Sequence, residues 1–290
     1  MKVTVSVSLL LLLTVSVEGR SQKKGLAVPS ESYRCGDFDV LHGVAWWYDW
    51  AQTPNYHSGC HRQLLANRVP MVWGWGAGVH VPNDAHYVLG FNEPNFHAQS
   101  NMSPQDAARH WRELQQQTGN KVLVSPAAAP CGDHNMCYSN GVDWFAQFFQ
   151  ACPDCKVDYL ATHNALPRTM FVMAVCVTVQ ACPDCKVDYL ATHGYWCDAN
   201  IMMHYLEDLW NRFHKKIWLT EFSCPQKHSV SDQLNYMKAV LPRLEAASYV
   251  YRYSWFATRF RGDGWIPREA SLLEQDSSTL TELGRYYMNF

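Results

Sequence analysis

Short apolar segments alternate along this 290-residue chain with longer polar segments of helical character. We predict strands at residues 40–47, 69–73, 87–91, 121–125, 187–193, 217–221 and 249–255. Several of these runs are almost continuously apolar, which is typical of parallel strands covered on both faces. Amphipathic segments predict helices at 103–119, 198–214 and 231–246. The first helix opens with Ser103 as its N-cap and Pro104 at the first helical position.

This alternation predicts an α/β fold with a parallel sheet. Seven strands are recognisable, one fewer than a (β/α)8 barrel needs, and we expect the missing strand within residues 48–81. The predicted architecture is a single-domain (β/α)8 TIM barrel over residues 35–290, in which Glu93 ends the fourth strand and Glu221 ends the seventh. A doubly wound open sheet is the competing architecture, but no glycine-rich phosphate loop follows the first predicted strand.

An internal repeat interrupts the barrel pattern. Residues 150–163 recur without change at 180–193, an offset of 30 residues. Solenoid repeats diverge and come in threes or more, so two identical copies indicate a recent tandem duplication or a gene-model error. We expect the copies to compete for the sixth strand position. The losing copy would lie outside the barrel with the apolar run at 170–179, which is an aggregation hazard.

The duplication also changes the cysteine count. The chain has 11 cysteines, and removal of one 30-residue window leaves eight, an even number that suits disulfides in an exported protein. Cys131 with Cys137 and Cys152 with Cys155 are candidate short-loop pairs. The sequence leaves open the partners of Cys35, Cys60, Cys197 and Cys224. The paired Cys-Pro-Asp-Cys motifs also resemble a zinc site, but duplication explains them, so we expect no metal and no cofactor.

The N-terminus predicts a secretory signal peptide over residues 1–19. An uncharged apolar run of 15 residues follows Lys2, which is shorter than the roughly 20 residues needed to cross a membrane. No later segment has the length and apolarity of a membrane anchor. We therefore expect a secreted, extracellular and soluble monomer. The triplet Asn101-Met102-Ser103 is a sequon for N-glycosylation, which agrees with export and predicts a glycoprotein.

Charge and aromatic content narrow the class of ligand. The net charge of -2 provides no field for attracting nucleic acid, so we expect a neutral ligand instead. The 12 tryptophans and 15 tyrosines can fill a core or provide flat surfaces for sugar rings. Trp46 and Trp73 lie near predicted strand ends and are candidates for sugar subsites, although a core role fits each equally well. Arg259 and Arg261 are predicted to be surface charges.

Two glutamates carry the strongest chemical signal. Glu93 closes the apolar run at 87–92, and Glu221 closes the run at 217–220. A carboxylate at the C-terminal end of a buried strand is costly unless the site uses it. Either residue alone could cap a turn or pair with a buried base. Together they predict glycoside hydrolysis, in which one carboxyl group protonates the leaving oxygen and the other acts at the anomeric carbon. Asn92 is placed to bind a sugar hydroxyl.

Four motifs around these residues resemble glycoside hydrolase family 128. They are Leu-Gly-Phe-Asn-Glu-Pro-Asn at 89–95, Ser-Pro-Ala at 125–127, Trp-Leu-Thr-Glu-Phe at 218–222 and Tyr-Ser-Trp-Phe at 253–256. The resemblance implies a (β/α)8 barrel and a retaining endo-β-1,3-glucanase that binds neutral β-glucan. It implies Glu93 as acid/base and Glu221 as nucleophile. It also places the family's sixth-strand histidine and neighbouring tyrosine on His193 and Tyr195.

Two further expectations complete this interpretation. Trp255, at the end of the predicted eighth strand, is our candidate for the floor of the central sugar subsite. The alternative to an enzyme is a non-catalytic β-glucan-binding protein on the same barrel, which has little use for two carboxylates aimed at one atom. A third possibility is a disulfide-rich secreted interaction protein whose fold the duplication has disrupted.

Overall fold

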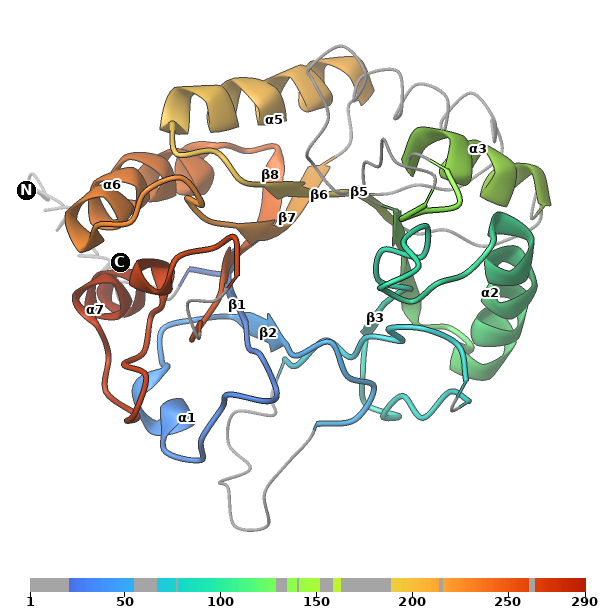
Figure 1. The fold of residues 1–290 in the computed structure, drawn as a ribbon, viewed down its shortest axis with the longest axis horizontal. Coiled ribbons are helices and arrows are strands. Elements are labelled where there is room, and N and C mark those ends of the chain that lie inside the picture. The colour runs from blue at the N-terminus through green and yellow to red at the C-terminus, as the bar shows by residue number, and fades with distance from the viewer. Residues whose placement is uncertain are drawn as a thin grey trace, which may run out of the picture.

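Eight parallel strands form one sheet, and the helices cover its outer face (Figure 1). The computed structural model describes residues 21–54, 67–76, 78–128, 135–139, 141–151, 159–162, 189–213, 216–260 and 264–290. Several predicted features lie outside these residues: the signal peptide, Cys60, Cys131, Cys152, Cys155, Arg261 and the apolar run at 170–179. In the parts of the chain described, no helix combines the length and apolarity that crossing a membrane requires.

The strands and helices alternate in chain order as the sequence predicts. The strands are β1 Lys24–Ala27, β2 Trp46–Tyr48, β3 Tyr87–Leu89, β4 Val122–Ala128, β5 Tyr159–Thr162, β6 Tyr189–Gly194, β7 Lys216–Phe222 and β8 Val250–Phe256. The helices are α1 Asp37–Val40, α2 Pro104–Thr118, α3 Gly141–Ala151, α5 Ala199–Phe213, α6 Val230–Ala246 and α7 Glu282–Asn289, with a 3-10 turn at Arg268–Ala270.

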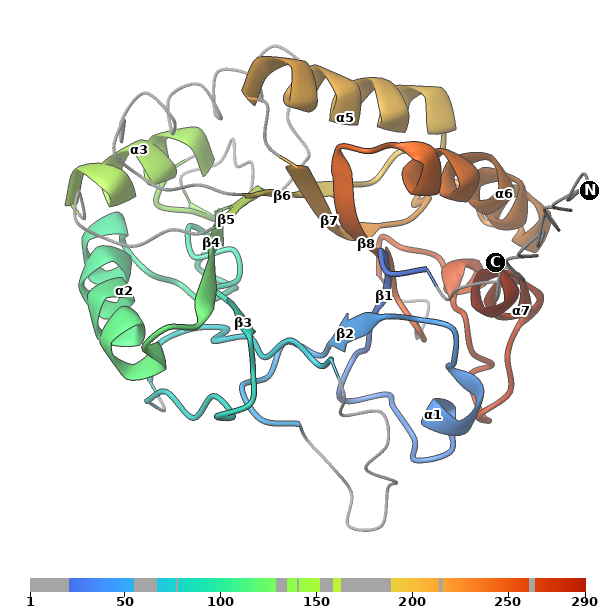
Figure 2. The same cartoon turned by 180° about the vertical axis from the view of Figure 1, so that it is seen from behind.

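The sheet closes on itself through an irregular segment at residues 67–72. The strand order is β2-β1-β8-β7-β6-β5-β4-β3, so β2 and β3 are its two ends. Val69 donates its N–H to the Trp47 carbonyl of β2 at 2.8 Å, and Val72 donates to the Leu89 carbonyl of β3 at 2.9 Å. The predicted strand at 69–73 therefore takes this joining position, and the strands form the ring seen from both sides in Figures 1 and 2.

The two identical copies of the repeat lie side by side in the sheet. Tyr159 of β5 pairs with Tyr189 of β6, and Thr162 pairs with Thr192. The expectation that one copy lies outside the barrel is wrong for these residues. The identical segments present matching backbone N–H and C=O groups, and their ladder runs without a register shift. If the joining segment at 67–72 is counted as the third strand and β5 is set aside, β6, β7 and β8 are the sixth, seventh and eighth strands, as predicted.

The first strand lies where the sequence did not predict one. β1 has four residues and includes Lys24, which obscures its apolar character. Burial of Lys24 is compensated by α7, because its Nζ donates to the Tyr287 carbonyl at 2.7 Å. The predicted strand at 40–47 divides instead between α1 and β2. The missing strand thus lies before residue 35 and not within 48–81, and the sheet extends beyond the predicted domain boundary.

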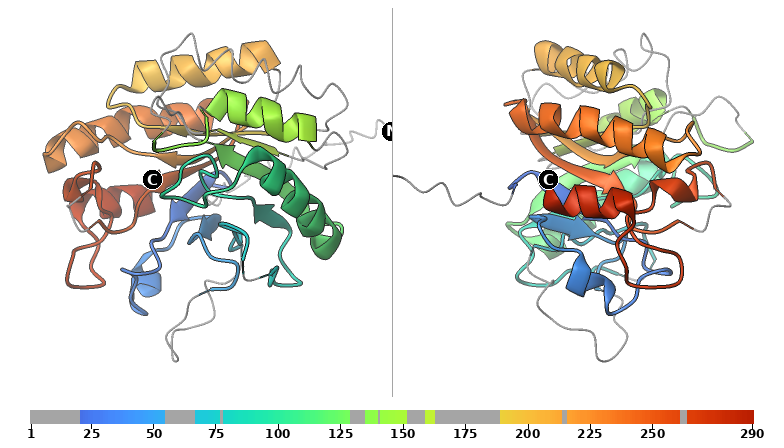
Figure 3. Two further views of the ribbon diagram at one scale, coloured as in Figure 1. Left: turned by 45° about the vertical axis from the view of Figure 1, so that its right-hand side comes forward. Right: turned by 90° about the vertical axis from the view of Figure 1, so that its left-hand side faces the viewer.

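Local capping explains where α2 begins. The Ser103 hydroxyl accepts a hydrogen bond from the Asp106 N–H at 3.1 Å, and Pro104 takes the first helical position, as predicted. The helix then buries Trp111 and Leu114 completely. Burial of a leucine side chain alone stabilises the folded state by about 2 kcal/mol. The apolar inner face of α2 therefore holds this helix against the outside of the sheet (Figure 3).

A buried ion pair connects the loop after β8 to α1. Arg259 donates to both carboxylate oxygens of Asp37, each at 2.8 Å, and only 4% of Arg259 is exposed. The prediction of Arg259 as a surface charge is therefore wrong. The guanidinium binds the Asp37 carboxylate in a bidentate arrangement and also donates to the carbonyls of Glu274 and Ser277. These hydrogen bonds offset the free-energy cost of burying its charge.

We expect the repeat to lower stability, because its two copies can substitute for each other in the sheet. Deletion of residues 164–193 from the 290-residue chain leaves 260 residues and a single copy. That variant should give a higher soluble yield and a higher melting temperature than the full chain. Expression of both chains in one host, followed by thermal unfolding, measures the difference. Equal yields and equal melting temperatures would contradict the expectation.

Candidate active site

Glu221 lies at the C-terminal end of β7, with its carboxylate held from several sides. Only 6% of the residue is exposed. The Tyr48 hydroxyl, from β2, donates to Oε1 at 2.8 Å. The Tyr195 hydroxyl, from the loop after β6, donates to Oε2, and Nδ1 of His193 lies 3.4 Å from the same oxygen. Three strands therefore converge on one buried carboxylate.

The two phenols remain hydrogen-bond donors over a wide pH range because their pKa values are raised. Burial raises the pKa of Tyr48 well above its ordinary value, and the charge of Glu221 and the hydrogen bond to it raise it further. Burial also raises the pKa of Tyr195, with the Glu221 charge next and the Glu93 charge contributing as well. Both hydroxyls therefore keep their protons at neutral pH. The Glu93 charge contributes to the raised pKa of Tyr195, so Glu93 lies within electrostatic range of this phenol.

Glu93 follows β3 in a constrained turn. Its N–H donates to the Ala127 carbonyl of β4 at 3.0 Å, and its own carbonyl accepts from the Phe96 N–H at 3.0 Å. Its φ angle is 40°, in the left-handed region that a glutamate rarely occupies. Such a conformation costs about 1–3 kcal/mol and persists only where surrounding contacts fix it. The backbone thus holds Glu93 at the rim of the sheet.

A small cavity lies between these strand ends and is partly open to solvent. Its polar wall is formed by Tyr48, Asn92, Ser125, His193, Thr220 and Glu221. Asn92 reaches the cavity as predicted, and its Nδ2 donates to Oε1 of Gln99 at 3.2 Å. A concave site with a few convergent polar groups is what a small ring needs for orientation.

Further aromatic rings contact the two phenols that bind Glu221. The Trp50 ring lies 4.8 Å from that of Tyr48, and the Phe256 ring lies 5.9 Å from that of Tyr195. The Trp265 ring lies 4.5 Å from that of Tyr195 and meets it at 68°. Trp265 is 61% exposed, so much of its indole is available to a ligand.

The structure places two predicted sugar-binding tryptophans in the core. Trp255 is fully buried, and its indole N–H donates to the Ala270 carbonyl at 2.8 Å. Its ring faces α6 and α7, so it cannot form the floor of a subsite. Trp46 is 1% exposed and packs edge-on against Trp218 at 5.2 Å. Trp73 is 38% exposed, and its carbonyl accepts from the Asn92 N–H, so it remains available beside the site.

Sequence analysis missed Tyr48, Trp50 and Trp265. Side chains alternate along a strand, so Trp46 and Tyr48 of β2 share a face, and Tyr48 is the one nearer the C-terminal end. The rule that selected Glu221 at its strand end would have selected Tyr48 here. Trp50 and Trp265 lie outside strands, in segments without periodicity, so no comparable signal identifies them.

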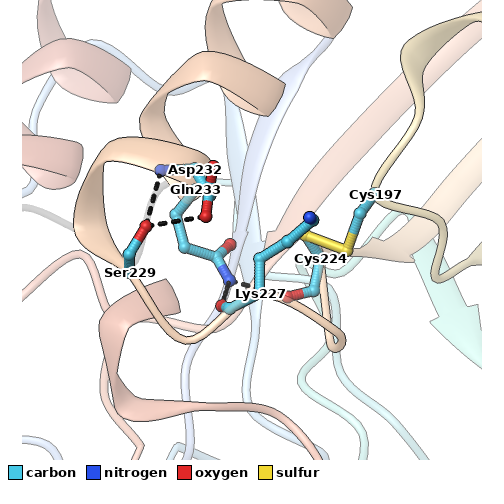
Figure 4. Close-up of a disulfide and its surroundings, with 6 residues drawn as sticks. All are labelled: Cys197, Cys224, Lys227, Ser229, Asp232 and Gln233. Atoms are coloured by element: carbon cyan, nitrogen blue, oxygen red, sulfur yellow. Dashed lines mark hydrogen bonds between the residues drawn. A yellow bond between two sulfur atoms is a disulfide. The ribbon is translucent and has the colours of Figure 1, made fainter.

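A disulfide braces the two loops beside Glu221. Cys197 follows β6 and Tyr195, and Cys224 follows β7 and Glu221; their Cα atoms lie 4.5 Å apart (Figure 4). The side-chain amide of Gln233 donates to the carbonyls of Cys224 and Lys227, each at 2.7 Å. Cys35 and Cys137 each take part in a disulfide as well. The link between Cys197 and Cys224 settles one pairing that the sequence left open.

Comparison with known proteins gives consistent matches over most of the chain. A model of the family described as glycosyl hydrolase catalytic core matches residues 25–169 and 178–287. Alkali-sensitive linkage protein 1 of Schizosaccharomyces pombe is 26% identical over 282 residues, which cover 93% of this chain and 45% of that protein. This chain therefore spans less than half the length of that relative.

Solved structures of similar size match the whole fold. A GH128 subgroup II endo-β-1,3-glucanase from Sorangium cellulosum superposes with a TM-score of 0.69 at 30% identity, covering 92% of this chain and 97% of that chain. A second subgroup II endo-β-1,3-glucanase, from Pseudomonas viridiflava, gives a TM-score of 0.64 at 28% identity, with the same coverage of 92% and 97%.

The raised pKa of Tyr48 predicts a loss of stability in alkali. Above pH about 10 the unfolded chain releases the Tyr48 proton while the folded chain retains it, so unfolding becomes more favourable as pH rises. The Tyr48→Phe variant should lose stability less steeply above that pH, by about 1.4 kcal/mol per pH unit. Urea unfolding at a series of alkaline pH values measures the slope. Tyr138→Phe, at an exposed position, should keep the wild-type slope; an unchanged slope in Tyr48→Phe would contradict the assignment.

Proposed function

This chain belongs to the glycosyl hydrolase catalytic-core family and to glycoside hydrolase family 128, and from that premise we propose that it is a secreted, retaining endo-β-1,3-glucanase. Its class is glycoside hydrolase. The proposal adds four details to that class: the glucan linkage that is cleaved, retention of the anomeric configuration, the roles of the two glutamates, and secretion. The observation that carries it is Tyr195, whose phenol donates to Glu221 and is also affected by the charge of Glu93.

Glu221 suits the role of nucleophile. Two phenol hydroxyls stabilise its negative charge and fix the orientation of the carboxylate. In the first step, an oxygen of Glu221 bonds to the anomeric carbon and the bond to the leaving glycosidic oxygen breaks. Glu93 donates its proton to that leaving oxygen. The product of the step is a glycosyl-enzyme ester and a shortened glucan with a new hydroxyl.

The second step reverses these roles. Glu93, now a carboxylate, removes a proton from water as the water oxygen bonds to the anomeric carbon. The ester bond to Glu221 breaks, and the carboxylate returns to its two phenol donors. Two inversions leave the anomeric configuration as it began. Asn92, in the cavity wall next to Glu93, is positioned to bond a sugar hydroxyl during both steps.

The surroundings of the two carboxylates suit a neutral polysaccharide. Trp50, Phe256 and Trp265 offer rings next to the two phenols that bind Glu221, and Trp73 is exposed near Asn92. Sugar rings bind such surfaces through their C–H faces without any net charge. The Sorangium cellulosum and Pseudomonas viridiflava relatives are described as endo-β-1,3-glucanases, which supports the same linkage and the same internal cleavage here.

Export is supported by two independent features. The first 19 residues have the charge and apolar pattern of a signal peptide. The Cys197–Cys224 disulfide is of the kind that persists in an oxidising compartment.

Loss of either carboxylate should remove most of the activity. Glu93→Gln and Glu221→Gln should each reduce reducing-sugar release from laminarin by about 10²-fold or more, because each removes a proton donor or a nucleophile. Glu274→Gln, an exposed glutamate away from the cavity, is the matched control. Near-wild-type rates in both active-site variants would exclude the mechanism. Glucan binding without hydrolysis by the wild type would favour a binding protein instead.

Trp265 should contribute to substrate binding but little to folding. Trp265→Ala should raise KM for laminarin by up to about tenfold, because a stacked ring is lost, while the melting temperature stays unchanged since the indole is 61% exposed. Trp265→Phe should restore most of the affinity. Ile201→Ala, at a 51% exposed apolar position on α5, controls for general surface effects. An unchanged KM in Trp265→Ala would remove this residue from the site.

A further inference from the structure

The loop from β3 to α2 carries a modification motif as well as Glu93 and Asn92. Asn101-Met102-Ser103 is the single Asn-x-Ser/Thr triplet in the chain. We propose that Asn101 bears an N-linked glycan beside the active-site cavity, on the same loop as Glu93. The proposal rests on the proposed secretion, because the glycan is added only to chains that enter the secretory pathway.

The side chain of Asn101 presents the atom that the modification needs. The residue is exposed, and its Oδ1 lies 3.0 Å from Nδ1 of His97. That contact engages the amide oxygen. Among the described residues, Nδ2 has no hydrogen-bond partner, so a sugar attached there displaces no contact. The exposed amide of Asn101 is therefore compatible with a glycan in the folded protein.

The transfer itself requires only a glycosyl donor of the usual class. Nδ2 of Asn101 bonds to the C1 atom of an oligosaccharide carried on a polyprenyl pyrophosphate. The bond between C1 and the pyrophosphate oxygen breaks, the lipid pyrophosphate leaves, and one proton is lost from the amide nitrogen. Neither oxidation nor reduction takes place, and the hydroxyl of Ser103 completes the recognised triplet.

The backbone around Asn101 directs the residue outward. Its φ angle of 49° lies in the left-handed region, which asparagine adopts more readily than most residues. The next residue, Met102, is buried and fixed, since its N–H donates to the Pro94 carbonyl at 2.8 Å and its carbonyl accepts from the Trp144 indole at 3.0 Å. A buried Met102 between Asn101 and Ser103 anchors the triplet while leaving Asn101 at the surface.

The position lies close to the proposed catalytic groups. Gln99, two residues before Asn101, accepts a hydrogen bond from Asn92 in the cavity wall. His97, the partner of Asn101, contacts the ring of Tyr138 at 4.7 Å, and Tyr138 is 43% exposed. The neighbouring Met136 is 55% exposed and accepts from the His97 N–H. A glycan here would lie beside two exposed apolar side chains, where a polar cover favours solubility.

Ser103 has a second role that the test must separate from the first. Its hydroxyl caps α2, accepting from the Asp106 N–H at 3.1 Å and donating to the Asp106 carboxylate at 2.7 Å. Asparagine is as good an N-cap as serine, and its amide can donate to the Asp106 carboxylate, but it does not complete a sequon. Ser103→Asn therefore keeps the cap and removes the modification, whereas Ser103→Thr keeps both. Asn101→Gly removes the amide and tolerates the left-handed backbone.

The test is secretion of the full chain, with its own leader, from a glycosylating yeast. We expect peptide-N-glycosidase F to lower the apparent mass and to convert Asn101 to Asp in its peptide. Ser103→Thr should behave in the same way. Ser103→Asn and Asn101→Gly should show no mass change on treatment, while Ser103→Asn keeps the melting temperature of enzymatically deglycosylated wild type.

The outcomes separate this proposal from the proposed function. Secreted wild-type protein with an unmodified Asn101 would overturn the glycan site. If the chain is not secreted with its own leader, secretion fails as a proposal, and residues 21–290 behind a host leader then test Asn101 in the same way. Laminarin hydrolysis is assayed separately, so a glycosylated but inactive protein would count against the glucanase and not against the modification.

Discussion

The buried carboxylate of Glu221 is the charge around which the C-terminal end of the barrel is arranged. A charge removed from water needs donors that stay in place, and Tyr48 and Tyr195 supply them. The burial that makes the charge costly also raises the pKa of both phenols, which keeps the donors protonated. Because β2, the loop after β6, and β7 each contribute one member of this group, their relative positions must be maintained.

Several contacts outside the site maintain those positions. The segment at 67–72 joins β2 to β3 and closes the ring, and the Cys197–Cys224 disulfide fixes the loops after β6 and β7. The Arg259–Asp37 pair ties the loop after β8 to α1. Parallel strands bring all their carboxyl ends to one rim, so constraints on different loops act together on one cavity.

Sequence reasoning located β3 and β7 because each continuous apolar run ends in a polar residue, at Glu93 and at Glu221. It predicted β7, the start of α2 and the alternation of the fold for the same reason: local pattern reflects burial. It failed at β1, whose four residues include a lysine that only the carbonyls of distant α7 make tolerable. Trp255 stands at the predicted strand end, but the face toward which a strand-end residue points depends on register, which a single sequence does not fix.

Because β5 and β6 have the same sequence, the chain contains the same strand in two different structural surroundings. The two strands share one sequence, yet β5 borders β4 whereas β6 borders β7. The same substitution at Leu160 and at Leu190 therefore removes the same side chain from equivalent positions of two strands with different neighbours. Any difference between the two unfolding free energies would report the neighbours alone, which separates intrinsic strand propensity from tertiary environment within one molecule.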